Sequence, residues 1–292
     1  MSRVAYVNGR YVPFGEASVH VEDRGFQFAD GVYEVWSVRG GRLNDADGHF
    51  DRLDRSLGEL AIDPPMSRGA LKVVLKETIR RNRIRDGLLY LQVTRGQPSL
   101  RQRPRDSTFP DPWTPPSVVA TARSVNPVAA ETRADQGIAV ITTPETRWAR
   151  CDIKTVGLLP NLLAKQKAKD AGATEAWFVD DLGLVTEGAS SNAWIVDKDG
   201  VLRTRDTQAN ILRGITRKTL LAILAREGVK MEERPFSLAE AKEAREAFIT
   251  GAGTLVLPVV SIDGAQVGDG KAGPVAKRLR RLYIEEARRT SI

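Results

Sequence analysis

The sequence is poor in the residues that bind transition metals or form disulfide bonds. Its 292 residues include one cysteine, Cys151, and two histidines, His20 and His49. A single cysteine cannot form an internal disulfide, which is typical of proteins of the reducing cytoplasm. So few thiol and imidazole groups provide too few ligands for a zinc or iron site, and we expect no bound metal. Nucleophilic catalysis that depends on histidine is disfavoured for the same reason.

Long hydrophobic runs are also missing. No stretch approaches the roughly 20 apolar residues that span a bilayer. The first residues lack the charged start and apolar segment of a signal peptide. Hydrophobic residues make up 41% and charged residues 28% of the chain, the composition of a globular protein. We therefore expect a cytoplasmic protein that is not embedded in a membrane.

No Gly-x-Gly-x-x-Gly fingerprint follows a predicted strand, and the Walker-type Gly-Lys-Ser/Thr loop and Gly-x-Ser-x-Gly are absent. Lysine and arginine number 44 against 37 acidic residues, a net charge of +7, which suits either nucleic acid or small anions. The densest basic clusters, residues 80–85 and 277–281, lie on predicted amphipathic helices and are interpreted as solvated helix faces. No helix-turn-helix or aromatic-rich sheet motif is present, so nucleic-acid binding is a distant alternative.

Short strands and helices follow one another without strict strand–helix–strand alternation, which favours an α+β fold. Asn8-Gly9 between two short β-like runs predicts an N-terminal hairpin. We expect two α+β domains, residues 1–122 and 135–292, joined by a linker at 123–134 that contains Asn126-Pro127. The predicted strands are 32–38, 88–94, 117–124, 138–142, 176–179, 193–196, 247–250 and 259–261. The predicted helices are 47–60, 67–83, 161–171, 214–227 and 274–289, the second with Ser67 as its N-cap.

A proline-rich segment interrupts the N-terminal half. Residues Gly96 to Pro116 contain six prolines and no periodic pattern. A structureless stretch of about 20 residues inside a compact protein is usually functional.

Three other segments each hold one group that a cofactor site could use. Lys154 precedes a Gly157–Asn161 stretch, Glu187 lies in a turn rich in hydroxyl and small side chains, and Gly214 opens a predicted helix. Taken singly, each is more often an ordinary strand end, turn or helix start. Pyridoxal phosphate needs all three parts: a lysine for a Schiff base, a carboxylate at the pyridine nitrogen and a cradle for the phosphate.

These segments also carry a family resemblance. The relevant runs are Arg-Cys-Asp-Ile-Lys (150–154), Asn-Leu-Leu-Ala-Lys-Gln (161–166) and Thr-Glu-Gly (186–188). With them the sequence resembles the fold-type IV pyridoxal-phosphate enzymes, which include D-amino-acid and branched-chain aminotransferases and aminodeoxychorismate lyase. The resemblance extends from Tyr6-Val7-Asn8-Gly9 to Asp269-Gly270-Lys271 and is closest to D-amino-acid transaminases.

The resemblance implies roles for particular residues. Lys154, in the C-terminal domain, would form the Schiff base and then move the proton between the substrate Cα and the cofactor. Glu187 would face the pyridine nitrogen. The other cofactor-binding residues it implies are Arg52 at the phosphate, the backbone of Ile215 and Thr216, Leu212 against the ring, and Ala252 in the Thr250–Thr254 turn.

Substrate recognition would involve Tyr33 and the proline-rich loop. D-amino-acid transaminases have an arginine and, two residues later, a histidine in this loop. The matching run here is Pro-Arg-Asp-Ser-Thr-Phe-Pro (104–110), so Arg105 keeps the arginine and Ser107 replaces the histidine. An alternative register uses Arg101 and Arg103. A second departure is that Ala252 or Gly253 stands where the family often has a hydroxyl residue, and either a backbone N–H group or Thr254 could take its place.

The function implied is transfer of the amino group from a D-amino acid to a 2-oxo acid such as 2-oxoglutarate or pyruvate. A branched-chain L-amino-acid or primary-amine transaminase of the same fold is the alternative. Family members form dimers with loops that cross between active sites, so the resemblance also implies a homodimer.

Overall fold

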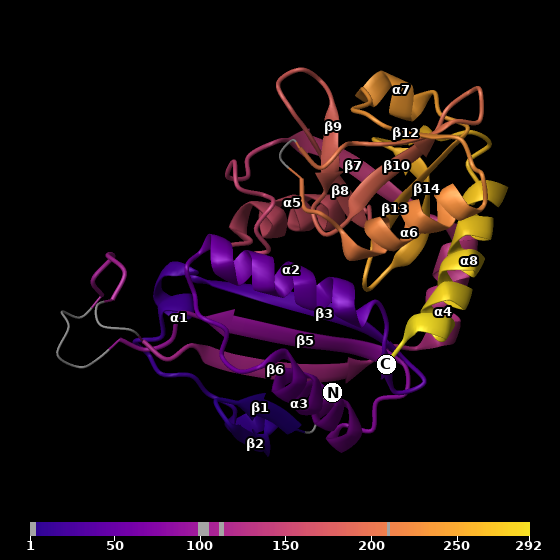
Figure 1. Cartoon of the computed structure of the whole chain (residues 1–292). Helices are drawn as coiled ribbons and strands as arrows, with labels where there is room; N and C mark the ends of the chain where they lie inside the picture. The colour runs from indigo at the N-terminus through magenta and orange to yellow at the C-terminus, as the bar shows by residue number, and fades with distance from the viewer. Residues whose placement is uncertain (1–3, 99–104, 111–113, 209–210) are drawn as a thin grey trace. The chain divides into compact units, whose positions relative to one another are not determined.

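The computed structural model describes residues 4–98, 105–110, 114–208 and 211–292 (Figure 1). The chain divides into two compact units. Unit 1 comprises Met1–Asn126 with Ile153–Gly157 and Ser291–Ile292, and unit 2 comprises Pro127–Asp152 and Leu158–Thr290. Both units mix helices and sheet, as the α+β prediction requires. No helix within the described ranges is long and apolar enough to cross a membrane.

Unit 1 is built on a six-stranded antiparallel sheet of order β2-β1-β6-β5-β3-β4. Helix α2 runs along β3, and α3 contacts β1 and β6 (Figure 1). Apolar side chains from the sheet and both helices form one buried cluster around Trp36, Phe50, Leu53 and Leu75. The strands are Val4–Val7, Arg10–Pro13, Gly31–Arg39, Arg42–Leu43, Gly87–Thr94 and Ser117–Ser124 (β1–β6). The helices are η1 (Phe14–Glu16), α1 (Arg24–Phe28), α2 (Ala46–Glu59) and α3 (Arg68–Arg81).

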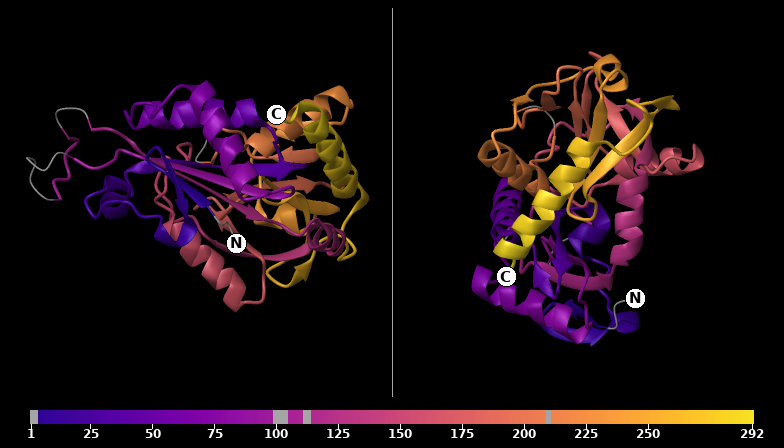
Figure 2. Two further views of the ribbon diagram at one scale, coloured as in Figure 1. Left: turned by 90° about the horizontal axis from the view of Figure 1, so that it is seen from below. Right: turned by 90° about the vertical axis from the view of Figure 1, so that its right-hand side faces the viewer.

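Unit 2 contains a nine-stranded mixed sheet of order β12-β11-β10-β13-β14-β7-β8-β9, with β15 paired to β14. Helices α6 and α8 pack together against β13 and β14 around Trp194, Phe248 and Tyr283 (Figure 2). The strands are Ile138–Pro144, Glu175–Val179, Val185–Gly188, Asn192–Val196, Leu202–Thr204, Met231–Glu233, Glu246–Gly251, Leu255–Ile262 and Ala265–Gln266 (β7–β15). The helices are Pro127–Gln136, Leu159–Asp170, Ile215–Arg226, Leu238–Lys242 and Pro274–Thr290 (α4–α8).

The units differ from the predicted domains in two respects. Residues 127–134 of the expected linker belong to helix α4, which packs with unit 2. Lys154 groups with unit 1 by its contacts, although its position in the sequence predicted the C-terminal domain. The physical reason is that Ile153 is buried in the core of unit 1 and the Tyr33 N–H group donates to the Lys154 carbonyl at 3.0 Å.

Candidate active site

Lys154 lies beside strand β3 in unit 1. Its backbone pairs with that strand through Tyr33, and the next residue, Thr155, bridges to Val32. The Lys154 Nζ atom lies 4.1 Å from the centroid of the Tyr33 ring, which stacks on Tyr90 at 5.6 Å. Within the described part of the chain the ammonium has no ion-pair or hydrogen-bond partner, so this amine is not neutralised by a carboxylate.

Arg52 lies on helix α2, which contacts β3, and the Lys154 N–H group donates to the Ser56 hydroxyl of the same helix at 3.4 Å. Its Nε and Nη2 atoms donate to the two Glu34 carboxylate oxygens at 2.7 and 2.8 Å. His49 Nδ1 lies 2.7 Å from Glu34 Oε2 and 3.5 Å from Arg52 Nη2. All three side chains are buried. His49 and Arg52, three residues apart on α2, are therefore joined by the carboxylate of Glu34 from strand β3.

Burial and ion pairing shift the pKa values of Glu34 and His49 in opposite directions. Burial raises the pKa of Glu34, but Arg52 and His49 outweigh it and lower that pKa to about 2. Burial lowers the pKa of His49 below its usual value, although Glu34 opposes the shift. At neutral pH the cluster is therefore an Arg52–Glu34 ion pair with a neutral imidazole beside it.

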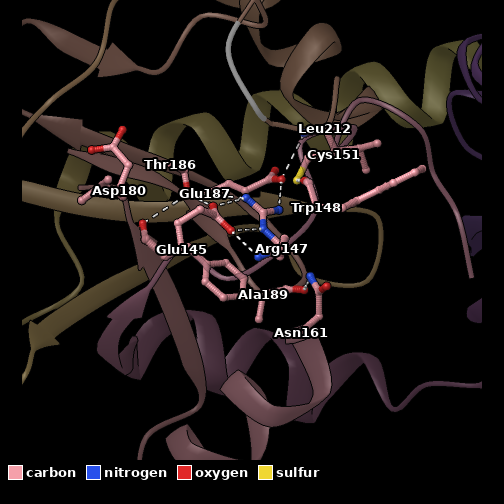
Figure 3. Close-up of polar contacts among 12 residues, drawn as sticks. Glu145, Arg147, Trp148, Cys151, Asn161, Asp180, Thr186, Glu187, Ala189 and Leu212 are labelled. Atoms are coloured by element: carbon pink, nitrogen blue, oxygen red, sulfur yellow. Dashed lines mark hydrogen bonds and ion pairs between the residues drawn. The ribbon is translucent and has the colours of Figure 1, made fainter. Parts of the chain in front are cut away.

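Glu187 is buried on β9 in unit 2, and its carboxylate contacts three groups, of which Figure 3 labels Arg147 and Leu212. Arg147 forms an ion pair with Oε1. The Leu212 N–H group donates to the same oxygen at 3.1 Å, and Asn192 Nδ2 donates to Oε2 at 2.9 Å. A buried carboxylate with this many donors is stabilised in its ionised form.

Arg147 is shared between two carboxylates. Its Nη2 atom lies 2.6 Å from Glu145 Oε2, and its guanidinium carbon lies 4.6 Å from the centroid of the Phe178 ring. Burial lowers the Arg147 pKa, but Glu145 and Glu187 more than reverse this, so the net shift is upward. Cys151 lies nearby, and burial raises its pKa to about 11. This thiol stays protonated at neutral pH and is not a nucleophile.

Helix α6 begins beside Glu187. Its N-cap, Gly214, has no side chain to bond the first amides, which belong to the buried residues Ile215 and Thr216. A Cβ atom at Gly214 would lie 1.9 Å from Asn192 Oδ1, so only glycine allows this close approach. Asn192 also donates to the Leu212 carbonyl at 3.0 Å and so joins the helix start to Glu187. Among the described residues no side chain caps the first amides of this helix, an arrangement that suits anion binding.

The turn after β13 contains Ala252 and Gly253, at the positions where the family often has a hydroxyl. Thr254, at its end, is the relevant hydroxyl residue here. Its Oγ1 atom is buried and has no hydrogen-bond partner in the described structure. It lies 3.3 Å from the position that a Cβ atom on Gly251 would take. A buried hydroxyl without a partner is costly unless something absent from the chain itself bonds to it.

The proline-rich loop has neither helix nor strand in the described segments 95–98, 105–110 and 114–116. Arg105 and Ser107 are exposed, and the Arg105 guanidinium carbon lies 5.2 Å from the centroid of the Phe28 ring. The alternative candidates Arg101 and Arg103 lie outside the described residues. The preference for Arg105 over them stays a prediction.

Sequence reasoning missed three residues of these clusters: Glu34, Arg147 and Asn192. Glu34 carried a signal, because a carboxylate inside the apolar strand of residues 32–38 needs a buried cationic partner. Arg147 and Asn192 look ordinary in the sequence. Their contacts with Glu187 depend on how β9, β10 and the segment after β7 meet.

A pyridoxal-phosphate-dependent enzyme uses three parts that are present here: a lysine without a carboxylate partner, a buried carboxylate and a helix start without a capping side chain.

Comparison with known proteins identifies the family of this chain. The family described as amino-transferase class IV matches residues 31–262. The chain is 40% identical over 280 residues to a D-alanine aminotransferase of Listeria monocytogenes, covering 96% of this chain and 94% of the relative. It is 42% identical over 273 residues to that of Bacillus licheniformis, covering 94% and 93%.

Solved structures agree with this assignment. A branched-chain amino acid aminotransferase of T.th., solved with pyridoxamine 5'-phosphate, matches with a TM-score of 0.89 and 28% identity, covering 99% of this chain and 95% of that one. The Escherichia coli branched-chain amino acid aminotransferase matches with a TM-score of 0.88 and 25% identity, covering 98% and 94%. The chain belongs to the class IV aminotransferases.

Proposed function

We propose that this aminotransferase transfers the amino group of a D-amino acid to a 2-oxo acid, with pyridoxal phosphate as its cofactor. The observation that carries the proposal is the match to D-alanine aminotransferases at 36–42% identity over nearly the whole chain. The branched-chain enzymes, which share the fold, match at 25–28% identity. The first group is therefore the better guide to substrate.

The residues present fit the cofactor. The Thr254 hydroxyl is buried without a protein partner, and the first amides of α6 have no capping side chain. Both are donors that a phosphate satisfies. Glu187 supplies the buried carboxylate that a pyridinium N–H group requires, and Lys154 supplies an amine without a carboxylate partner. We assign the phosphate to Ile215, Thr216, Thr254 and the Ala252 turn, together with Arg52, and we assign Leu212 to the ring face.

When bound, pyridoxal phosphate acts as an electron sink for the bonds at the substrate Cα. Glu187 maintains this property by keeping the pyridine nitrogen protonated, because an anion close to a cationic group favours its charged form. Lys154 would hold the cofactor through its side-chain amine and would move the proton at the substrate Cα.

Substrate selection is assigned to Tyr33 and the proline-rich loop. The α-carboxylate of an amino acid needs a cationic partner when it leaves water, and Arg105 is the candidate. Ser107, which stands at the family's histidine position, adds at most a neutral hydrogen bond.

We also propose that the protein is a homodimer. The exposed apolar side chains Leu159, Leu162 and Leu163 lie on one face of α5, with 61–67% of their surface accessible. Adjacent apolar side chains on an exposed helix face are typical of an interface.

A cytoplasmic location and the absence of nucleic-acid binding stay predictions. The basic helix faces agree with the second, because Arg80 and Arg81 pair with Glu77, and Arg278 pairs with Glu227.

A substrate panel tests the function. The purified holoenzyme is mixed with single D- or L-amino acids, and the cofactor absorbance near 400 nm is followed before and after adding 2-oxoglutarate or pyruvate. We expect D-alanine and related D-acids to bleach the absorbance and the 2-oxo acids to restore it. Faster reaction with L-leucine, L-valine or L-isoleucine than with any D-acid would assign the branched-chain function instead.

A further inference from the structure

The segment that carries Arg105 and Ser107 is attached to unit 1 through its own backbone. Arg24 Nη1 donates to the Asp106 carbonyl at 2.6 Å, and Nη2 donates to the Ser107 carbonyl at 3.4 Å. Arg24 is 3% exposed although it belongs to the short helix α1. A buried guanidinium thus holds the carbonyls of the two residues that directly follow Arg105.

Arg24 is itself fixed by Asp30. Its Nε atom donates to Asp30 Oδ2 at 2.8 Å, so the planar guanidinium binds the carboxylate with one edge and the loop with the other. This bridging needs the several N–H groups of an arginine. A lysine ammonium, a single point of charge, cannot reproduce that geometry.

A second arginine shares the same carboxylate. Arg95 donates to both oxygens of Asp30, at 2.7 and 3.0 Å, and to the carbonyls of Leu60 and Ala61 at the end of α2. Its guanidinium carbon lies 3.7 Å from the centroid of the Phe109 ring. The loop segment is therefore held at its start by hydrogen bonds from Arg24 and near its end by stacking on Arg95.

Asp30 connects this anchor to the strand that carries the substrate-facing residues. It directly precedes β3, which contains Tyr33 and pairs with Lys154. The segment also has internal order, because Asp106 Oδ1 accepts hydrogen bonds from the Thr108 N–H group and hydroxyl at 2.9 and 2.8 Å. Loops that position a charged side chain for binding need such support, since small displacements weaken recognition strongly.

We propose that Arg24, fixed by Asp30 and assisted by Arg95, is a positioning residue for substrate recognition that holds Arg105 where it binds the substrate α-carboxylate. The inference rests on the proposed function, in which Arg105 provides that binding. The inference adds to the proposed function a role in substrate affinity for Arg24, a buried residue of α1 that acts through the loop.

The test is a double-mutant cycle in the holoenzyme with Arg24→Lys, Arg105→Ala and the double variant. Arg24→Lys should raise KM for D-alanine about tenfold while kcat and pyridoxal-phosphate affinity change less than twofold. Arg105→Ala should raise KM further. The double variant should resemble Arg105→Ala alone, because a positioning residue has nothing left to position. Arg68→Lys is the control, since this exposed arginine of the same unit pairs with Asp51 and Asp54 away from the loop.

Hydrogen–deuterium exchange supplies a readout that does not depend on substrate. Arg24→Lys should increase exchange in peptides that cover residues 105–110 and leave peptides of β5 and β6 unchanged. An unchanged KM, or an effect that adds fully to that of Arg105→Ala, would overturn the inference. So would unchanged exchange in the loop. If Arg105→Ala leaves KM for D-alanine unchanged, or if the wild-type enzyme does not accept D-amino acids, the proposed role of Arg105 falls. In that case the exchange data still decide separately whether Arg24 orders the segment.

Discussion

Among single side chains, Lys154 offers the simplest test of the proposed chemistry. Lys154→Ala should reduce turnover by at least a thousandfold, because covalent binding and proton transfer depend on the same amine. Lys165→Ala is the control, since the half-exposed Lys165 bonds to the Thr174 carbonyl and Glu175 among the described residues. The measurement is transamination rate, together with mass spectrometry after borohydride reduction. Persisting turnover with the reduced cofactor on another lysine would show that Lys154 has been misassigned.

Glu187 can be tested by removing its charge without changing its shape. Glu187→Gln should lower kcat by about 100-fold or more, in the range of other electrostatic stabilisers, because a neutral amide does not keep the pyridine nitrogen protonated. Pyridoxal phosphate should still bind. Glu246→Gln is a matched control: Glu246 is also buried but caps α8 through the N–H groups of Val275 and Ala276. Glu246→Gln should lower the stability of the protein and leave kcat unchanged. Equal losses of kcat in Glu187→Gln and Glu246→Gln would count against a specific role for Glu187.

The sequence predicted some site residues and not others for a definite physical reason. Lys154 and Glu187 stand within short motifs whose chemistry can be interpreted locally. The partners of Glu187 cannot be found in this way. Arg147 is 40 residues away in sequence and meets Glu187 only through sheet pairing. Glu34 differs, because a carboxylate in a buried strand predicts a cationic partner, although not which one.

At the scale of elements, the Glu34 cluster joins β3 to α2 and should make their association depend on pH. Removing one member of a buried ion pair leaves the other uncompensated, so Glu34→Gln should lower the free energy of unfolding by about 3–5 kcal/mol at pH 7. The folded pKa of Glu34, about 2, lies below the usual 4.5. Its stabilisation is therefore complete above pH 4.5 and is lost as the pH falls towards 2. Lowering the pKa of Glu34 from 4.5 to about 2 corresponds to about 3 kcal/mol of stability.

Urea unfolding of the cofactor-free protein between pH 2 and pH 7 measures this effect. Below pH 4.5 the free energy of unfolding of Glu34→Gln should change less with pH than that of the wild type. Glu77→Gln is the comparison, because the pKa of Glu77 is also lowered to about 2, but by exposed arginines that solvent and salt screen. Parallel curves for wild type and Glu34→Gln would mean that the cluster does not link these two elements.

Most regular elements were predictable because local patterns agree with the tertiary fold. Ser67 caps α3 as expected by accepting a hydrogen bond from the Ala70 N–H group. Helix α4 was missed because Asn126-Pro127 and small residues were interpreted as a linker. Proline is also favoured at the first position of a helix, and Ala129-Ala130-Glu131 are good helix formers. The short helix α1 was missed because five residues give no periodic signal.

At the scale of the whole chain, periodicity reveals where elements begin and end but not which unit a segment packs into. The expected boundary near residue 122 is close to the observed one at Asn126. The return of Ile153–Gly157 to unit 1 was not predictable, because it depends on Ile153 filling the core of that unit and on a single strand-like bridge to Val32. The unit that holds Lys154 is thus decided by long-range contacts, although the residue itself is marked by a local motif.

The proposed homodimer gives the last prediction. Leu162→Glu would introduce a charge among Leu159 and Leu163, and burying it on association without a partner should cost about 3 kcal/mol or more. The dimer dissociation constant should therefore rise at least 100-fold, measured by analytical ultracentrifugation across a dilution series. Leu182→Glu is the control, because Leu182 is more exposed, at 82%, but is an isolated apolar side chain in the turn after β8. If the loop of one protomer serves its partner's substrate, as the family resemblance implies, KM for D-alanine should rise on dilution in step with dissociation. A wild-type dimer that Leu162→Glu does not weaken would place the interface elsewhere than on α5.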